Sequence, residues 1–412
     1  MTTLAVTVFI LVYAGMALGR VPGLAIDRTG VALLGLIVLL ATGDLTLDEA
    51  GRAVDMPTIA LLFALMIISA QFEQSGFYGM VADRVTHAAR NPKLLLAAIV
   101  LVTGILSALL TNDVVVFALT PLICTGLMAQ GLDARPYLVA LAGAANAGSA
   151  ATLIGNPQNI LIGQAGGLPF WSYILMALPP TLFALAAVYV AVIATWSGVL
   201  NTPDPANDAW IARDRPRVHR FQIAKAFGAV ALLVGLFLTP LPRELGALAV
   251  AGLLLLSRRM SSRDMIGAVD WHLLLLFTCL FGVTAAFAKT GLSQDGLAWL
   301  TAQGLWPDRL SVLTPLTLIS SNTIGNVPAV ILIIRLIPDL SQGALAGLAL
   351  LSTFAGNLLL TGSLCNIIVA ERAESAGARL SFMDFARSGV PMTLASLAAT
   401  AAWLWYTGLM KF

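Results

Sequence analysis

The chain has 412 residues, of which 58% are hydrophobic and 11% are charged, with a formal net charge of +2. The charged fraction is about half that of an ordinary soluble domain, so the composition excludes a soluble globular protein and predicts a polytopic membrane protein. A net charge this small argues against nucleic acid as a partner. Cys124, Cys279 and Cys365 lie in apolar segments without metal-ligand spacing, which argues against a disulfide framework or a zinc site.

In the first half, apolar runs predict membrane-spanning helices at 2–19, 25–43, 57–74, 136–165 and 170–196, and a re-entrant hairpin at 93–129. The first segment has no basic n-region, so we expect a retained span and not a signal peptide. The polar, proline-containing stretch 201–221 predicts a cytoplasmic linker. The second half predicts spans at 222–239, 244–257, 271–288, 345–370 and 389–409, and a hairpin at 309–338.

The two halves repeat one pattern. The segment AVD at 53–55 recurs at 268–270, and each copy continues into an apolar helix broken by Asn and Gly. Five crossings plus one re-entrant hairpin give each half an odd number of crossings, so the two repeats are predicted to be inverted. We expect scaffold helices at about 1–90, transport elements at about 91–166 and a further helix to 196 in the repeat 1–200. The repeat 222–412 has its transport elements at about 308–370.

The positive charges predict the orientation. If the N-terminus lies outside, 16 of the 23 Lys and Arg residues fall in cytoplasmic segments, Arg20 and Arg28 among them, as the positive-inside rule requires. The first external loop is acidic, with Asp44, Asp48 and Glu49. We therefore predict both termini outside, in a bacterial inner membrane. The two hairpins then enter from opposite sides, an arrangement that serves alternating access.

Four breaks interrupt apolar helices at membrane depth, at 110–113, 144–159, 320–328 and 356–366. An unpaired backbone group in hydrocarbon costs several kcal/mol, so non-helical backbone is expected only where protein or water satisfies it, and each break predicts a polar cavity. Function is expected at the breaks because interrupted helices at matching positions of two repeats mark transporter binding sites. The predicted binding residues are Thr111, Asn112, Asp113, Asn146, Gly155, Asn156, Asn159, Ser321, Asn322, Thr323, Asn326, Asn357, Thr361, Gly362, Ser363 and Asn366.

The residue types at the breaks predict what they bind. Half-helix N-termini suit an anion or a neutral oxyacid, and carbonyl, hydroxyl and Asn oxygens suit Na+. We predict Na+ sites near Asn112 and Gly155 and near Asn326 and Gly362. Asp113 is the only carboxylate at a hairpin tip, where a charge costs roughly 2.5–3.5 kcal/mol. Two roles stay open for it: carrying a coupling H+ or Na+, or capping the second arm of the hairpin.

At these residues the chain resembles the ion transporter superfamily. LLTNDVVVFALTPL and SSNTIGNVPAVILI are similar to the two hairpins of its arsenite-permease, NhaD and P-protein branch, and TLIGNPQNILIG and LLTGSLCNIIVAERA resemble its unwound helices. The resemblance implies an elevator transporter that forms a homodimer. In the related divalent-anion/sodium symporters, Ser-Asn-Thr motifs at both tips bind Na+ and carboxylate. Here Ser321-Asn322-Thr323 is out of register with the repeat, which favours the arsenite-permease branch.

The leading hypothesis is a secondary transporter for a small oxyanion or oxyacid, coupled to H+ or Na+, with no cofactor beyond that ion. The alternatives are a Na+/H+ antiporter and a Na+-coupled di- or tricarboxylate symporter. A channel-like or receptor protein is disfavoured by the inverted broken repeats. The chain lacks a G-x-x-x-x-G-K-[ST] loop, so ATPase activity is not expected within it, although a separate ATPase partner stays open.

Overall fold

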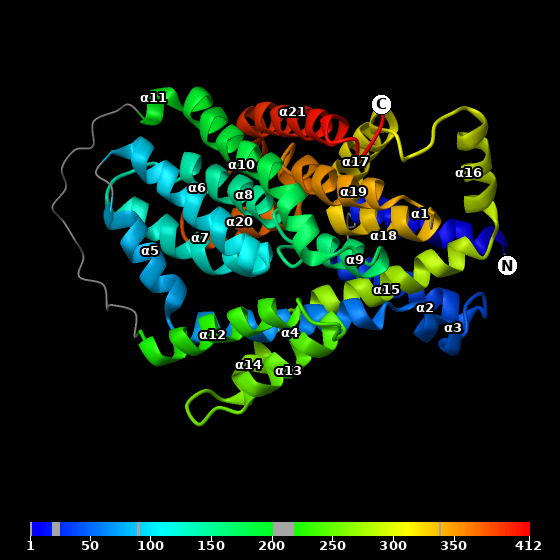
Figure 1. Cartoon of the computed structure of the whole chain (residues 1–412), viewed down its shortest axis with the longest axis horizontal. Coiled ribbons are helices and arrows are strands. Elements are labelled where there is room, and N and C mark those ends of the chain that lie inside the picture. The colour runs from blue at the N-terminus through cyan, green and yellow to red at the C-terminus, as the bar shows by residue number, and fades with distance from the viewer. Residues whose placement is uncertain (1, 19–24, 89–90, 201–217, 338) are drawn as a thin grey trace.

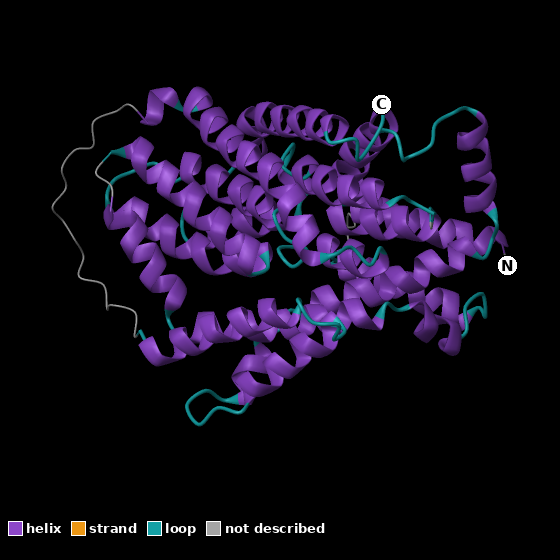
Figure 2. Ribbon diagram, viewed as in Figure 1, coloured by secondary structure: helices purple, strands orange, loops and turns teal. Residues whose placement is uncertain are grey.

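The computed structural model describes residues 2–18, 25–88, 91–200, 218–337 and 339–412, and every regular element in these ranges is a helix (Figures 1 and 2). The expectation of an all-helical chain is therefore confirmed for the part that the structure describes. Of the predicted linker 201–221, residues 201–217 lie outside the described ranges.

Helices of the first half end or begin at the predicted breaks. The hairpin breaks after Leu109, and the long span predicted at 136–165 is divided after Ser149. The elements are α1 (Thr2–Leu18), α2 (Arg28–Ala41), α3 (Leu47–Ala53), α4 (Met56–Gln74), α5 (Phe77–Ala88), α6 (Pro92–Leu109), α7 (Asn112–Ala129), α8 (Arg135–Ser149), α9 (Pro157–Ala165), α10 (Phe170–Thr195) and α11 (Ser197–Leu200).

The second half follows the same order, with the hairpin broken at Gly325 and the span predicted at 345–370 divided by a 3₁₀ turn. Its elements are α12 (Arg220–Leu236), α13 (Arg243–Leu255), α14 (Ser262–Gly267), α15 (Trp271–Ala288), α16 (Leu292–Ala302), α17 (Leu310–Ile324), α18 (Asn326–Leu336), α19 (Gln342–Ala355), η1 (Leu360–Gly362), α20 (Leu364–Ser375) and α21 (Phe382–Tyr406).

Matching local signals start matching helices. Asp55 caps α4 by accepting a hydrogen bond from the amide of Thr58 at 3.0 Å, and Asp270 caps α15 by accepting one from Leu273 at 2.9 Å. The hairpin tips differ in their backbone. Thr111 is extended at the first tip, whereas Gly325 at the second has a φ of 95°, which glycine adopts without the steric cost of a Cβ.

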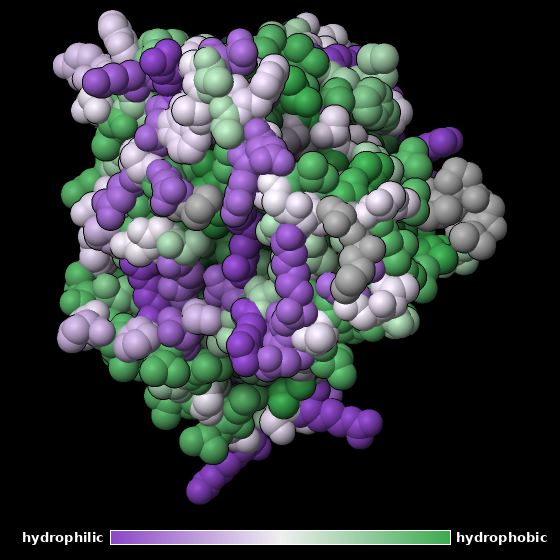
Figure 3. Space-filling view, turned by 90° about the vertical axis from the view of Figure 1, so that its right-hand side faces the viewer, coloured by the Kyte–Doolittle hydropathy of each residue, from purple (hydrophilic) through white to green (hydrophobic). Residues whose placement is uncertain are grey.

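The hairpins lie toward opposite ends of the molecule. In Figure 1 helices α6 and α7 occupy the left part and α17 and α18 the right part, while both termini lie at the right. The short helices α5 and α16 cross the ends, α5 at the left and α16 at the right. Seen end-on from the right, hydrophilic side chains gather over the middle of this face and hydrophobic side chains lie around its margin (Figure 3).

Helix packing separates two groups of elements. In one group, α4 packs on α12 and α13, and α2 packs on α1 and α15. Helices α2, α4, α12 and α13 form the lower layer in Figure 1. The hairpins pack with the broken helices in the other group, as α6 with α8, α7 with α20, α9 with α18 and α17 with α19. Helices α10 and α21 pack on each other and against α8 of that second group.

Five helices of the described residues are long and apolar enough to cross a membrane: α4, α6, α7, α10 and α15. Shorter apolar helices of 10–17 residues accompany them, including both arms of the second hairpin. Outside the spans, Glu49 of α3 pairs with Lys289 at the end of α15 at 2.5 Å. Its hydrogen bond with Lys289 lowers the pKa of Glu49 to about 2.

Gly148 tests the close packing of α6 and α8. A Cβ at this position would meet the backbone of Gly104, whereas a Cβ on Gly252 of α13 would meet open space. We expect Gly148→Ala to destabilise the protein by about 1–3 kcal/mol through overpacking. Gly252→Ala should be neutral or stabilising by up to about 1 kcal/mol, because Ala favours helix. Melting temperatures of the two purified variants check this, and equal melting temperatures would contradict it.

Candidate functional site

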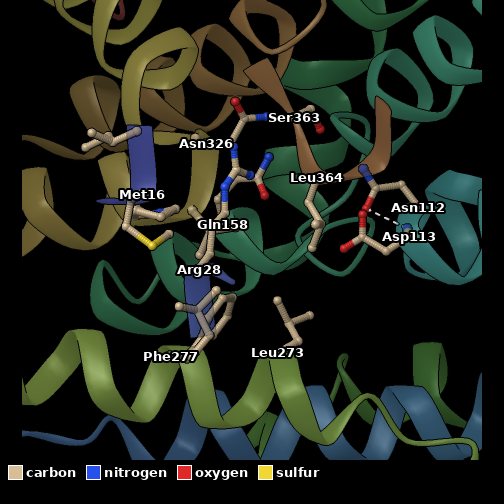
Figure 4. Close-up of a pocket in the computed structure, with 15 residues that line it drawn as sticks. Met16, Arg28, Asn112, Asp113, Gln158, Leu273, Phe277, Asn326, Ser363 and Leu364 are labelled. Carbon is tan, nitrogen blue, oxygen red and sulfur yellow. Dashed lines mark hydrogen bonds between the residues drawn. The ribbon is translucent and has the colours of Figure 1, made fainter. Parts of the chain in front are cut away.

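The broken helices meet at one small cavity of about 50 Å³. Both hairpin tips contribute to it, together with the broken helices and the facing helices α1, α2 and α15 (Figure 4). At about 10–15 Å³ for each water-sized group, the cavity has room for about three to five such groups. Its lining residues are Met16, Arg28, Asn112, Asp113, Gln158, Leu273, Leu276, Phe277, Ile324, Gly325, Asn326, Val327, Pro328, Ser363 and Leu364.

Four half-helices begin at this cavity. The N-termini of α7, α9, α18 and α20 each supply lining residues, which brings the positive ends of four helix dipoles together. The Asn156 side chain caps α9 by accepting a hydrogen bond from the Asn159 amide at 2.8 Å. Helices α18 and α20 have no side-chain cap hydrogen bond. Their first amide groups are therefore left to bind water or a ligand.

Asn146 connects the two halves beside the cavity. Its amide nitrogen donates to Asn357 Oδ1 at 2.8 Å and to Asn366 Oδ1 at 2.9 Å. Its Oδ1 accepts hydrogen bonds from Asn112 Nδ2 at 3.0 Å and from Ser363 Oγ at 3.1 Å. All four partners come from predicted breaks. Asn146 thus joins Asn357 and Asn366 in one network beside the cavity, and none of the three is among the residues that line it, so their predicted role in binding stays a prediction.

The two hairpin tips differ in how well their asparagines are satisfied. Asn112 donates to Asn146, and its Oδ1 accepts the amide of Asp113 at 2.9 Å. Its counterpart at the second tip, Asn326, is 5% exposed, and its Oδ1 has no hydrogen-bond partner within the described structure. A buried polar atom without a partner costs free energy unless a ligand or water supplies one. Of the two tip asparagines, Asn326 is therefore the one with an oxygen open to a ligand.

Asp113 lies in the first turn of α7, facing the cavity. Within the described ranges no hydrogen bond reaches its carboxylate, and the start of α7 has no side-chain cap hydrogen bond. Capping the second arm, one of its two predicted roles, therefore receives no support from the structure. Figure 4 places Asn112 and Asp113 on one side of the cavity and Arg28 and Asn326 on the other, with Ser363 between them.

Arg28 is the functional candidate that the sequence reasoning missed. It is counted above with the cytoplasmic loop charges, but in the structure it is the first residue of α2 and lines the cavity with Asn326 and Gln158 (Figure 4). Its guanidinium has no hydrogen bond or salt bridge to any residue that the structure describes. One signal pointed to it: an arginine, Arg243, also begins the matching helix α13, at the same offset that relates the two AVD segments.

Most other predicted residues lie near the cavity as supporting groups. Asn156 donates to Ser149 Oγ at 2.8 Å, and Asn159 donates to the carbonyl of Thr152 at 3.0 Å. A Cβ on Gly155 or on Gly362 would meet neighbouring backbone or the Asn322 side chain, so both positions need glycine. The predicted Na+ positions near Asn112, Gly155, Asn326 and Gly362 stay predictions.

The out-of-register motif of the second hairpin does not enter the cavity. Thr323 is exposed, and its hydroxyl donates to the carbonyl of Ile319 in its own helix. Asn322 donates to the carbonyl of Ala355 at 2.8 Å, and Ser321 is buried with an unpartnered hydroxyl. Thr111 has a buried unpartnered hydroxyl and lines a larger neighbouring cavity, and Thr361 lines another.

Two larger cavities, of about 460 Å³ and about 680 Å³, share lining residues with the small one. The first shares Asp113 and Leu273, and the second shares Arg28, Leu273, Leu276 and Leu364. Carboxylates predominate among the charged residues that line them: Asp27, Glu73, Asp113, Asp270 and Glu371, against Arg28. Like charges repel, so these approaches disfavour a multiply charged anion and accept a cation or a neutral molecule.

Comparisons with known proteins agree with this arrangement. A 46 kDa membrane protein of Mycobacterium leprae is 30% identical over 98% of both chains. A silicon efflux transporter of Oryza sativa subsp. japonica is 27% identical over 91% of both chains. Among solved structures, the YdaH transporter of Alcanivorax borkumensis has the same fold, with a TM-score of 0.55 over 99% of this chain and 98% of that one, at 17% identity.

The chain is also matched by a family model. The model is described as citrate transporter (CitMHS), and it matches residues 9–355, which include both hairpin tips and most of the residues around the cavity between them. The resemblance first seen in the broken-helix motifs therefore extends over most of the chain. The protein is an integral membrane transporter and belongs to the citrate transporter family of the ion transporter superfamily.

Proposed function

We propose that the protein is a secondary transporter for a small, uncharged inorganic oxyacid, coupled to H+ or Na+. The observation that carries this proposal is the small cavity between the two hairpin tips, which is lined by both hydrogen-bond donors and acceptors. Arg28 and the uncapped start of α18 supply donors. Asp113 and Asn326 Oδ1 supply acceptors without partners in the described structure.

A ligand must satisfy both kinds of group. A fully ionised oxyanion has only acceptor oxygens, so it leaves Asn326 Oδ1 unpaired and brings its charge close to Asp113. An undissociated hydroxy acid offers hydroxyl donors and oxygen acceptors together. The acidic lining of the two approach cavities supports the same choice, because a neutral solute crosses it without repulsion.

Size separates this proposal from the carboxylate alternative. Three to five water-sized groups, about the capacity of the cavity, match the oxygens of one small oxyacid and not a tricarboxylate. The name of the family refers to citrate, whereas the rice relative is named for silicon efflux. The size and the lining of the cavity support a small inorganic oxyacid, and not citrate, as the substrate of this chain.

The transport mechanism is proposed to be an elevator movement of two inverted repeats. The repeated order of helices and the hairpins toward opposite ends of Figure 1 support inversion. The hydrogen bonds of Asn146 join the hairpin-bearing elements into one body, which would move against α1, α2, α4, α12, α13 and α15. The homodimer and the placement of both termini outside a bacterial inner membrane stay predictions.

A Na+/H+ antiporter is the second candidate, and the carboxylates Glu73, Asp113 and Asp270 around one cavity favour it. In that case no oxyacid would move. The position of Arg28 in the small cavity favours the oxyacid transporter, because a fixed cation repels Na+.

The substrate class is tested by ligand binding and flux. Silicic, arsenous and boric acids should raise the melting temperature of the purified protein in a concentration-dependent way, because a ligand that binds only the native state stabilises it. Citrate and sulfate serve as controls and should give no shift. Proteoliposome uptake of the same solutes completes the test. Stabilisation and uptake of citrate, without effects of the oxyacids, would contradict the proposal.

The coupling role of Asp113 is tested by Asp113→Asn. This change keeps the shape of the side chain and removes its charge, so concentrative transport driven by an imposed H+ or Na+ gradient should be lost. Exchange of substrate at equal concentrations should persist, because it needs no net ion movement. Asp264→Asn, at an exposed position of α14, is the control. Unchanged gradient-driven uptake in Asp113→Asn would remove Asp113 from the coupling step.

Substitutions of two asparagines distinguish a role in substrate binding from a role in stability. Asn326→Ala removes an unpartnered oxygen, so substrate flux should fall while the melting temperature stays near that of the parent. Asn146→Ala leaves four buried partners unsatisfied, each at a cost of about 1–3 kcal/mol, so it should lower the melting temperature strongly. Thermal unfolding and flux of both variants check this, and the reverse pattern would refute the assignment.

A further inference from the structure

Three leucines lie between the small cavity and the larger cavities beside it. Leu273, Leu276 and Leu364 line both the small cavity of about 50 Å³ and the neighbouring cavity of about 680 Å³. Among the described residues, Leu273 alone lines these two cavities and also the cavity of about 460 Å³. The leucines therefore form part of the wall that separates the small cavity from its larger neighbours.

The leucines come from both groups of helices. Leu273 and Leu276 lie three residues apart on α15, so they share one face of this helix. Leu364 is the first residue of α20, which packs with the hairpin helix α7 in the other group. Figure 4 shows Leu364 extending toward α15, and Leu273 pointing from α15 toward Leu364. The wall is thus built where α15 and the start of α20 face each other.

The cap of α15 holds Leu273 in place without requiring a leucine there. The amide of Leu273 donates to Asp270 Oδ1 at 2.9 Å, which fixes the first turn of the helix. The offset that relates the two AVD segments pairs Leu273 with Thr58, whose amide donates to Asp55 in the same way. The repeated helix start therefore accepts a threonine as well as a leucine. We infer that the leucine is needed for the cavity that it lines and not for the start of α15.

The wall has charged parts and apolar parts, which act on a ligand in different ways. Arg28 is shared by the small cavity and the cavity of about 680 Å³, and Asp113 is shared by the small cavity and the cavity of about 460 Å³. These two groups can form hydrogen bonds with the hydroxyls of an oxyacid. A leucine offers no hydrogen bond, so it acts on a ligand only through the space that its side chain fills.

We propose that Leu273 and Leu364 set the upper size limit of the substrate and exclude oxyacids that carry an organic substituent. This inference rests on the proposed function, because it names a limit within the class of uncharged oxyacids. The small cavity has room for about three to five water-sized groups, which the hydroxyls of one inorganic oxyacid fill. An attached aromatic ring needs the space that the two leucines occupy.

Boric acid and phenylboronic acid test the size limit. Both are uncharged at neutral pH and carry hydroxyls on boron, and they differ in one hydroxyl that an aromatic ring replaces. Their dissociation constants are measured by isothermal titration calorimetry on the full chain in phosphatidylcholine nanodiscs. Glycerol and sugar detergents are left out, because boronic acids form esters with diols. The parent protein should bind phenylboronic acid at least roughly tenfold more weakly than boric acid.

Truncation of either leucine should change this preference. Leu364→Ala or Leu273→Ala joins the small cavity to its neighbour, and an apolar space of about 150 Å³ is enough to hold a benzene ring. The ratio of the two dissociation constants should shift toward phenylboronic acid by roughly tenfold or more. Leu274→Ala is the matched control, because Leu274 lies on the same helix, is 6% exposed and lines none of the three cavities. A role in packing alone would lower the melting temperature of these variants without changing the ratio.

Failure to fold is separated from a change in selectivity. Leu364 is partly exposed, so its truncation should leave the protein folded. If Leu273→Ala does not fold, Leu273→Val replaces it, with methylboronic acid as the ligand that fits the smaller gain in space. The size limit is overturned if the parent binds phenylboronic acid as tightly as boric acid, or if the folded variants keep the ratio of the parent. Absence of boric acid binding to the parent would instead contradict the proposed function, and the size limit with it.

Discussion

The structure depends on one constraint: a helix broken inside a membrane protein must find partners for its polar groups within the protein. Here the partners come from the other half of the chain. Asn146 of the first half binds Asn357, Ser363 and Asn366 of the second, and Asn156 of the first half donates to Thr353 of the second at 3.3 Å. Because such groups are costly to leave unpaired in a low-dielectric interior, these bonds hold the four breaks in one place.

Once the breaks are held together, the chemistry of the site depends on the polar groups that have no hydrogen bond within this network. The first tip is satisfied through Asn112, whereas the second tip keeps the free Oδ1 of Asn326. Asp113 and Arg28 lie across the cavity, and no hydrogen bond from the described residues reaches either charged group. The repeat therefore supplies a symmetric frame, and the differences between its copies leave the donors and acceptors on which the proposed oxyacid selectivity rests.

Much of the fold followed from local patterns in the chain. The four breaks and the two hairpins lie where Asn, Gly or Pro interrupts the apolar runs, and α4 and α15 begin within one residue of the spans predicted at 57–74 and 271–288. The binding roles of the individual residues stay predictions, and only their surroundings are known from the structure. Asn146 binds Asn357 and Asn366, Thr323 is exposed, and Arg28, which was counted with the loop charges, lines the small cavity. A residue type shows what a side chain can bind, but it does not show which partner reaches it.

The sequence by itself determined the membrane class, the repeated order of helices and the positions of the breaks. These properties follow from apolarity and backbone geometry, which act over a few neighbouring residues. Only the tertiary structure decided which polar groups form hydrogen bonds with one another around Asn146 and which stay free for a ligand. That outcome depends on pairs far apart in the chain, such as Asn146 and Asn366, and on the approach of Arg28 to both hairpin tips. Hydrogen bonds form only at contact distance, so no local pattern reveals them.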